Sequence, residues 1–132
     1  MKRGDVVIAT GPGFGGKPRP NLVIQADEYL SLSTLILLPI TSDLSDPPSL
    51  LRVRIDPDDA NGLREVSEVM TDIPVTTRPD KVHKYAGTLS AEDMERVEDA
   101  IFLVLGFAGC MLGIKYSVPE IGVPEIADEQ GL

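Results

Sequence analysis

Short apolar runs, separated by glycine, proline and aspartate, fill the first two thirds of the chain, a pattern typical of a mainly β protein. Asp5–Ala9 is the first run, and Asn21–Ala26 and Thr34–Thr41 are nearly continuous, which predicts central strands covered on both faces. Leu51–Ile55 alternates, with three apolar residues on one face and two arginines on the other. Val66–Met70 also alternates, and we expect a fifth strand there.

The hydrophobic period changes to that of a helix after Ser90. Ser90 and Asp93 have the spacing of a capping box, in which the serine hydroxyl accepts from the Asp93 amide and the Asp93 carboxylate returns a bond. Apolar residues then recur at helical spacing, at Met94, Val97, Ile101 and Leu105. The sequence therefore predicts one amphipathic helix that packs on the strands and ends near Gly106 or Gly109.

The length of 132 residues suits one domain, and no apolar run approaches the roughly 20 residues that span a bilayer. The charged N-terminus is not followed by the apolar stretch and cleavage site of a secretory signal. The single cysteine, Cys110, excludes an internal disulfide framework and fits a reducing compartment. We expect a cytoplasmic protein that does not contact a membrane.

An imperfect repeat marks the end of the chain, Val118–Gly122 followed by Val123–Ala127. Proline at every fifth residue blocks a continuous helix, so we expect a domain at 1–109 and an acidic, proline-containing tail at 110–132. One interpretation is an ordinary flexible tail. The other is that its Pro-Glu-Ile repeats dock on a basic groove of the domain and imitate RNA or an acidic partner segment.

The formal net charge of −9 argues against a nucleic-acid binder, because such proteins gain affinity by neutralising phosphates. The segment 110–132 contributes −3 of this charge, and the rest of the chain is still acidic. Any RNA site must therefore be a local basic patch.

Several chemistries are excluded by residue counts. One histidine and one cysteine cannot supply the nitrogen and sulfur ligands of a zinc site, and a ribonuclease mechanism with paired histidines is impossible. The glycine-rich segment before Lys17 resembles a phosphate-binding loop in composition, but Pro18 follows the lysine where serine or threonine is needed. We expect neither a metal nor a cofactor.

The segment Lys17-Pro18-Arg19-Pro20 is the most unusual feature of the sequence. Proline fixes its own φ and restricts the residue before it, so the backbone of Arg19 is stiffened on both sides. A guanidinium held at the mouth of a strand matches phosphate oxygens by bidentate hydrogen bonding. The alternative is a strand entry bounded by prolines, with a solvated arginine.

Five ordered blocks extend this feature into a family resemblance. They are Arg3–Val7, Lys17–Gln25, Pro39–Ser42, Gly62–Asp72 and Gly87–Ser90. Over residues 3–107 the chain resembles the MazF/PemK/Kid family, the toxin endoribonucleases of type II toxin-antitoxin systems. The resemblance implies a mainly β fold with a C-terminal helix, a small SH3-like or CcdB-like β-barrel, and a homodimer.

The resemblance also implies a reaction and partners. The implied activity is metal-independent, sequence-selective cleavage of single-stranded mRNA, in which the substrate's 2′-hydroxyl attacks the adjacent phosphorus. The implied partners are single-stranded RNA and a cognate antitoxin protein. The protein must then supply a base, an acid and charge stabilisation, but neither a nucleophile nor a metal.

Site residues follow from the positions that match. Arg19 would stabilise charge on the phosphorane and donate a proton, Thr41 would hydrogen-bond the scissile phosphate, and Asp72 matches an aspartate with a base-like role. Supporting or substrate-binding candidates are Lys17, Ser42, Ser67, Arg52, Arg54, Arg78, Lys81 and Lys84. Each also has a plain interpretation, as a strand end, a turn carboxylate or a solvated charge.

The chain departs from the family pattern after the aspartate. The family usually has Gln-Ile-Arg-Thr or Gln-Pro-Arg-Thr where this chain has Ile73-Pro74-Val75-Thr76, so an arginine is lost, and Arg78 lies close enough in sequence to substitute. Met70 stands where one branch of the family has an arginine. His83 lies in a stretch with no regular pattern, and we expect a surface or packing role for it.

Two other functions fit the same pattern. One is a CcdB-like toxin without catalysis, which binds and poisons a protein target such as DNA gyrase. The other is a catalytically silent interaction module. Convergence of Arg19 and Thr41 discriminates between them and the ribonuclease, because only the ribonuclease needs a guanidinium and a hydroxyl at one phosphate.

Overall fold

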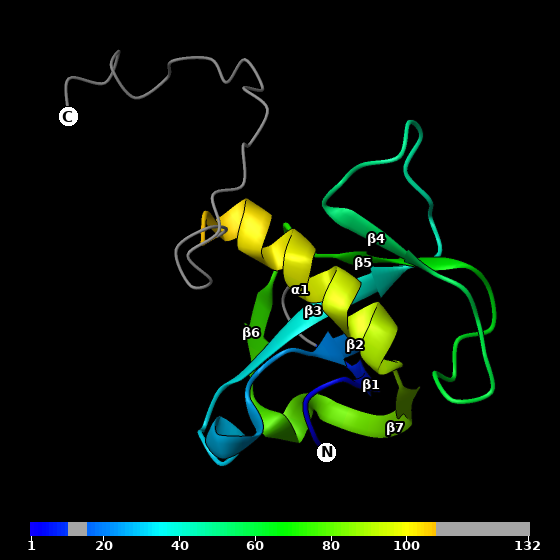
Figure 1. Ribbon diagram of the computed structural model, residues 1–132. Coiled ribbons are helices and arrows are strands. Elements are labelled where there is room, and N and C mark those ends of the chain that lie inside the picture. The colour runs from blue at the N-terminus through cyan, green and yellow to red at the C-terminus, as the bar shows by residue number, and fades with distance from the viewer. Residues whose placement is uncertain (11–15, 108–132) are drawn as a thin grey trace.

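A computed structural model describes residues 1–10 and 16–107 of the chain as seven strands followed by one α-helix (Figure 1). The strands are β1 (Asp5–Ala9), β2 (Arg19–Val23), β3 (Leu35–Thr41), β4 (Arg52–Ile55), β5 (Ser67–Met70), β6 (Val75–Thr77) and β7 (Val82–Thr88), and the helix is α1 (Ala91–Leu105). The predicted tail at 110–132 and its docking hypothesis lie outside the described residues, as does Cys110.

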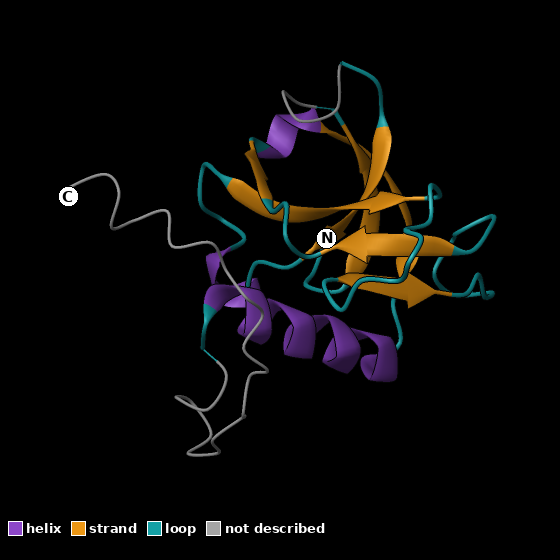
Figure 2. Cartoon of the chain, turned by 90° about the horizontal axis from the view of Figure 1, so that it is seen from above, coloured by secondary structure: helices purple, strands orange, loops and turns teal. Residues whose placement is uncertain are grey.

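The strands form one antiparallel sheet in the order β4-β5-β3-β2-β1-β7, and β6 pairs with a further stretch of β3. Within the described residues the path runs from β4 to β7 without closing, so "barrel" is a loose description of a strongly curved open sheet. The expected mainly β fold with a C-terminal helix is confirmed. Figure 2 shows the curved sheet with α1 lying along one side of it.

The core has two parts because the central strands bury both faces. The larger part lies between the sheet and α1, and β1 contributes Val6, which is fully buried. The neighbouring Val7 points to the opposite face and joins a smaller cluster with Val23 and Leu37. The prediction of central strands covered on both faces is thereby confirmed for β2 and β3, although β2 begins two residues earlier than expected.

The helix begins where the capping pattern predicts. The Ser90 side chain accepts from the Asp93 amide at 3.1 Å, whereas the Asp93 carboxylate accepts from Arg96 Nη1 at 3.0 Å. The capping box is therefore half formed, since the arginine takes the carboxylate. At the other end Gly106 adopts a left-handed φ of 78° that terminates the helix.

The predicted apolar stripe of α1 is buried in its first part only. Met94 and Val97 pack in the larger core and Ile101 packs against it, and Ala100 is buried with them. Leu105 is 54% exposed, so the last position of the predicted stripe does not reach the core. Among the described residues, no helix is long and apolar enough to cross a membrane.

Two strands were not predicted from the sequence. β6 has three residues, and β7 contains exposed polar residues such as His83 and Lys84 instead of an apolar run. The expectation that His83 lies in irregular structure is therefore wrong. β7 is an edge strand whose register with β1 shifts at two points, so its polar outer positions meet solvent. Such a strand is stabilised by its pairing, which leaves little pattern in the sequence.

Candidate functional site

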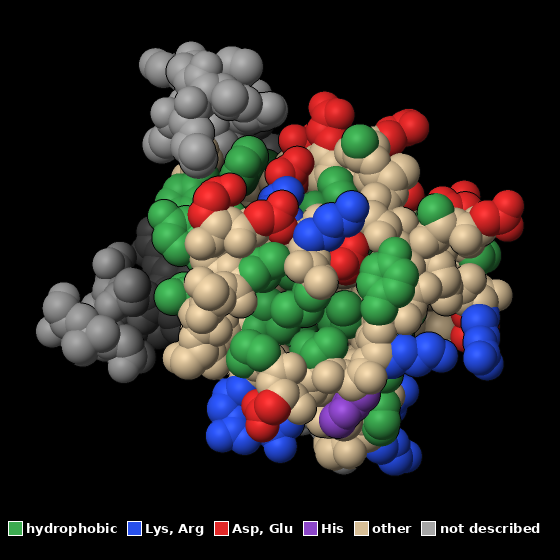
Figure 3. All heavy atoms as spheres, turned by 90° about the horizontal axis from the view of Figure 1, so that it is seen from below, with side chains coloured by type: hydrophobic (Ala, Val, Ile, Leu, Met, Phe, Trp, Pro, Cys, Tyr) green, Lys and Arg blue, Asp and Glu red, His purple; other side chains and the backbone are tan. Residues whose placement is uncertain are grey.

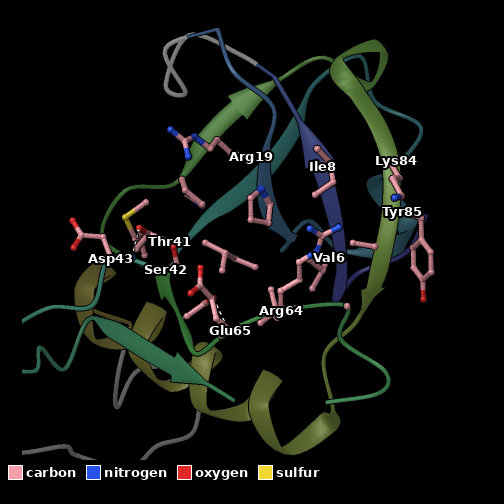
Figure 4. Close-up of a pocket in the computed structure, with 18 residues that line it drawn as sticks. Val6, Ile8, Arg19, Thr41, Ser42, Asp43, Arg64, Glu65, Lys84 and Tyr85 are labelled. Carbon is pink, nitrogen blue, oxygen red and sulfur yellow. Dashed lines mark hydrogen bonds between the residues drawn. The ribbon is translucent and has the colours of Figure 1, made fainter. Parts of the chain in front are cut away.

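A cleft of about 960 Å³ opens on the face of the sheet formed by β1, β2 and β3, between β7 and the loop that connects β4 to β5 (Figure 4). Its apolar floor includes Val6, Ile8, Pro20 and Ile40. The polar and charged side chains that line it are Arg19, Thr41, Ser42, Asp43, Arg64, Glu65, Ser67, Lys84 and Tyr85. The cleft is thus an apolar trough with cations, hydroxyls and two carboxylates around it.

The surface charges are unevenly distributed. Figure 3 shows one face with apolar side chains gathered at its centre, acidic side chains along one border and lysine and arginine along the opposite border. A local concentration of cations can therefore exist on this acidic chain, as an RNA site would require.

Arg19 is the first residue of β2, where its Cα pairs with Ala9 of β1. Its carbonyl oxygen accepts from Asn21 Nδ2 at 2.8 Å, which ties the backbone that follows the proline. Asn21 is fully buried, and its Oδ1 has no hydrogen-bond partner among the described residues. The local backbone is therefore held by strand pairing, by two prolines and by a buried amide, while the guanidinium lies exposed at the rim of the cleft.

Thr41 ends β3, where the chain turns away from the sheet. Its Oγ1 accepts from the backbone amide of Asp43 at 3.0 Å. Because the oxygen is the acceptor in that bond, the hydroxyl proton remains available for donation into the cleft. Ser42 follows directly and also lines the cleft.

A buried asparagine shapes the loop between β4 and β5. Asn61 is fully buried; its Oδ1 accepts from the amides of Asp58 and Leu63 at 3.2 and 3.0 Å, and its Nδ2 donates to the Asp56 carbonyl at 2.9 Å. These side-chain hydrogen bonds hold the loop backbone, which has no hydrogen bonds of a strand pair. The loop therefore presents the residues after Asn61 in a defined arrangement.

Two glycines let this loop touch β7. A Cβ built on Gly62 would lie 2.1 Å from the carbonyl oxygen of Ala86, and one built on Gly87 would lie 2.3 Å from the Asn61 carbonyl carbon. The Thr88 amide also donates to the Ala60 carbonyl at 2.8 Å. Backbone therefore meets backbone at this crossing, which brings Arg64 and Glu65 to the cleft.

The arginines divide into two groups. In the described residues, five of the seven arginines form an ion pair with a carboxylate: Arg3–Glu98, Arg52–Asp72, Arg54–Glu68, Arg78–Asp80 and Arg96–Asp93. Arg19 and Arg64 form none with any described carboxylate, and both line the cleft. On a chain with a net charge of −9, the two arginines left for an external anion therefore both lie at the cleft.

The structure brings together some of the residues predicted from the sequence. Those that line the cleft are Arg19, Thr41, Ser42, Ser67 and Lys84. Those that do not line it are Lys17, Arg52, Arg54, Asp72, Arg78 and Lys81. Arg19 and Thr41 therefore line one cleft, whereas most of the other predicted cations lie elsewhere.

Asp72 forms an ion pair with Arg52 and does not line the cleft. Arg52 Nε lies 2.9 Å from Asp72 Oδ1 and Nη2 lies 3.3 Å from Oδ2, a two-point contact between the start of β4 and the turn after β5. Arg78, considered as a replacement for the missing family arginine, pairs with Asp80 on the surface. In this arrangement neither Asp72 nor Arg78 faces Arg19 across the cleft.

Arg54 is paired with a buried carboxylate. Glu68 is 1% exposed and accepts from Arg54 Nη2 at 2.9 Å and from the amide and hydroxyl of Ser45 at 3.0 Å each. Burial would raise the pKa of Glu68, but the hydrogen bonds from Ser45 and Arg54 and the charge of Arg54 outweigh it, and the pKa is lowered. Arg54 therefore stabilises the fold around the loop that follows Thr41.

Two residues of the cleft were not singled out from the sequence. Arg64 and Glu65 follow the Asn61-Gly62 turn, and both are exposed. Figure 4 shows the Arg64 side chain extending into the cleft and the Glu65 carboxylate pointing into it. The sequence signal that could have identified them is a pair of adjacent charged residues shortly after Asn61-Gly62, within the block Gly62–Asp72 that resembles the family.

A second, smaller hollow lies beside the first along β7. It is lined by residues from the N-terminus, β1 and β7, including Lys2, Asp5 and His83. His83 Nε2 lies 2.8 Å from Thr10 Oγ1, so the histidine links β7 to the end of β1, consistent with the expected surface or packing role. No group of three or more His, Cys, Asp and Glu side chains in the described residues could hold a metal ion.

Comparison with known families gives one match over most of the chain. Residues 2–105 match the model of the PemK-like, MazF-like toxins of type II toxin-antitoxin systems. A protein of Mycolicibacterium smegmatis named "Probable endoribonuclease MazF" is 39% identical over 110 residues, which cover 83% of this chain and 100% of that protein.

Solved structures share the fold. Mycobacterium tuberculosis toxin MazF-mt6 matches with a TM-score of 0.66 at 23% identity, covering 77% of this chain and 96% of that one. An endoribonuclease in complex with its cognate antitoxin, from a mycobacterial species, matches with a TM-score of 0.63 at 20% identity, covering 80% and 93% of the two chains. MazE-MazF from Deinococcus radiodurans matches with a TM-score of 0.64 at 20% identity, covering 80% and 95%.

Proposed function

The chain belongs to the family of PemK-like, MazF-like toxins of type II toxin-antitoxin systems, and we propose that it is an endoribonuclease that cleaves single-stranded mRNA in the cleft around Arg19 and Thr41. The relative that is 39% identical carries the name of an endoribonuclease, and the match spans its whole length. This favours the ribonuclease over a CcdB-like poison of a protein target and over a silent module.

One observation supports the location of the site. Arg19 and Arg64, the arginines without an ion pair among the described carboxylates, line the same cleft as the Thr41 hydroxyl. A guanidinium recognises phosphate oxygens through paired hydrogen bonds, and an arginine already bound to a carboxylate would have to give up that partner first. The trough between them is apolar, which suits the faces of unstacked bases.

The chemistry uses groups that the cleft holds and one that the substrate supplies. The RNA 2′-hydroxyl attacks the adjacent phosphorus, and negative charge grows on the non-bridging oxygens. Arg19 stabilises that charge, and Thr41 donates its free hydroxyl proton to one of these oxygens, since Oγ1 already accepts from the Asp43 amide. Neither a protein nucleophile nor a metal enters this scheme.

The assembly follows from the family. We expect a cytoplasmic homodimer that is neutralised by a cognate antitoxin protein. The mycobacterial endoribonuclease of similar fold was solved in complex with its cognate antitoxin. An acidic segment of such a partner would meet the same unpaired cations that an RNA strand meets.

The direct test is cleavage of single-stranded RNA by the purified full-length chain in the presence of EDTA. Removing one positioned charge-stabilising donor costs roughly 100- to 1,000-fold in rate, so Arg19→Ala should lose at least about 100-fold. Arg96→Ala is the matched control and should cleave like the wild type, because Arg96 does not line the cleft and its exposed guanidinium bonds Asp93 and the Arg54 carbonyl. Cleavage abolished by EDTA, or retained by Arg19→Ala, would reject the proposal.

A further inference from the structure

We propose that Glu65 is the general base of this ribonuclease, taking the proton from the attacking 2′-hydroxyl. The inference deepens the proposed function and depends on it. Transphosphorylation by a 2′-hydroxyl requires a group that accepts this proton as the new P–O bond forms. Neither a histidine nor a cysteine is among the described residues that line the cleft, which leaves a carboxylate as the proton acceptor.

The carboxylate suggested by family resemblance is engaged elsewhere. Both oxygens of Asp72 face Arg52, at 2.9 and 3.3 Å, and Asp72 does not line the cleft. An acceptor bound on both oxygens by a guanidinium would have to break that contact before it could take a proton. Asp72 is therefore the competing assignment, and its geometry is unfavourable.

Two carboxylates do line the cleft, Asp43 and Glu65. Figure 4 shows that the Asp43 side chain points outward, whereas the Glu65 carboxylate points into the cleft, in the part where Thr41 and Ser42 lie. Neither forms an ion pair with any described lysine or arginine. Glu65 is thus the carboxylate with the direction and the freedom that a base needs.

The backbone of Glu65 is held on both sides. Its carbonyl accepts from Ser67 Oγ at 2.9 Å, and Ser67 is buried at the start of β5. On the other side the chain is fixed by the buried Asn61 and by the backbone crossing at Gly62. A base on a loop is effective only if the loop is positioned, and these contacts supply that positioning.

The step balances without a metal or a further reactant. The 2′-oxygen forms a bond to phosphorus as its proton moves to the Glu65 carboxylate. The bond between phosphorus and the 5′-oxygen breaks, and the leaving oxygen takes a proton from a solvent water molecule, leaving a 2′,3′-cyclic phosphate and a 5′-hydroxyl. Arg19 and Thr41 stabilise the charge on the non-bridging oxygens throughout.

The experiment compares Glu65→Gln with Asp72→Asn in single-turnover cleavage of single-stranded RNA over a range of pH. General-base catalysis contributes roughly 100- to 10,000-fold, so Glu65→Gln should slow cleavage at least about 100-fold and lose the acidic limb of the pH profile. Asp72→Asn should slow it much less and keep that limb. The reverse order would overturn the assignment and return the role to Asp72.

A second pair of measurements excludes a merely structural role. Wild type and Glu65→Gln should bind an RNA analogue with a 2′-deoxy residue at the cleavage site equally tightly. The analogue has no 2′-hydroxyl proton, and that proton is the one on which the Glu65 carboxylate acts. Added formate should restore part of the rate to Glu65→Ala and none to Arg19→Ala. Weakened binding without rescue would refute the base. A wild type that does not cleave RNA would instead refute the proposed function.

Discussion

Glu68 of β5 and Arg54 of β4 form an ion pair across the strands, with Arg54 Nη2 2.9 Å from Glu68 Oε2. The same carboxylate holds Ser45 in the loop that follows β3 through two bonds of 3.0 Å. A fully buried carboxylate thus connects the edge strand β4 and its neighbour β5 to the segment that begins with Thr41. These contacts position the segment after β3, in which Thr41, Ser42 and Asp43 line the cleft.

Replacing Glu68 by glutamine should lower the free energy of unfolding by about 2 kcal/mol at neutral pH. This is below the range for a fully buried pair, because the Arg54 side chain is 42% exposed. The folded pKa of Glu68 lies below its ordinary value of 4.5, so its contribution is present above that pH and is lost as the pH falls through the lowered pKa.

Urea unfolding at neutral and at acidic pH measures this effect. The difference in stability between wild type and Glu68→Gln should shrink on acidification. Asp80→Asn, which breaks the exposed pair with Arg78, serves as the control and should change stability little at either pH. A difference that is independent of pH would contradict the ionised state of Glu68.

Gly87→Ala should destabilise the fold and weaken RNA cleavage together. Its Cβ would lie 2.3 Å from the Asn61 carbonyl carbon, and neither backbone can move without disturbing the crossing that positions Glu65. Overpacking of this kind costs about 1 to 3 kcal/mol or more, measured by thermal unfolding. An alanine side chain at Gly16 would meet no described atom within 4 Å and bears only the strain of its φ of 78°, so Gly16→Ala should be milder.

Arg64→Ala should weaken RNA binding while leaving the fold intact, because the guanidinium is exposed and has no described carboxylate partner. Each phosphate contact on a single strand contributes a slope of roughly 0.7 in log affinity against log salt. In a salt titration of RNA binding, the slope for the mutant should be smaller by about the value of one phosphate contact. An unchanged slope would place Arg64 outside the RNA path, and Arg96→Ala provides the control for loss of a positive charge.

Ser90→Ala should cost about 1 kcal/mol of stability without changing the cleavage mechanism. The Ser90 hydroxyl accepts from the Asp93 amide at 3.1 Å, and loss of such a cap leaves that donor without its partner at the helix start. Ser90→Asn, which retains an acceptor at the same position, should recover most of the loss in chemical denaturation. Equal stability of all three proteins would show that the cap is redundant.

Elements with a local signal were predictable from the sequence. β1 was predicted with its observed bounds, and the start of α1 directly after Ser90 followed from its capping pattern. β7 was not predicted, because its outer positions are polar and its pairing with β1 is irregular. Leu105 was predicted to lie on the buried stripe of the helix but is exposed. Whether a position at the end of a helix meets the core depends on the angle at which the helix packs.

The site divides in the same way. The sequence by itself determined the strand entry at Arg19, because two prolines constrain the backbone locally, and it placed Thr41 at a strand end. Only the tertiary structure decided that Asp72 is bound to Arg52 and that Arg64 and Glu65 reach the cleft. The reason is physical: ion-pair partners and the crossing of two backbones join residues far apart in the chain, and no local pattern encodes which of several charges remains free.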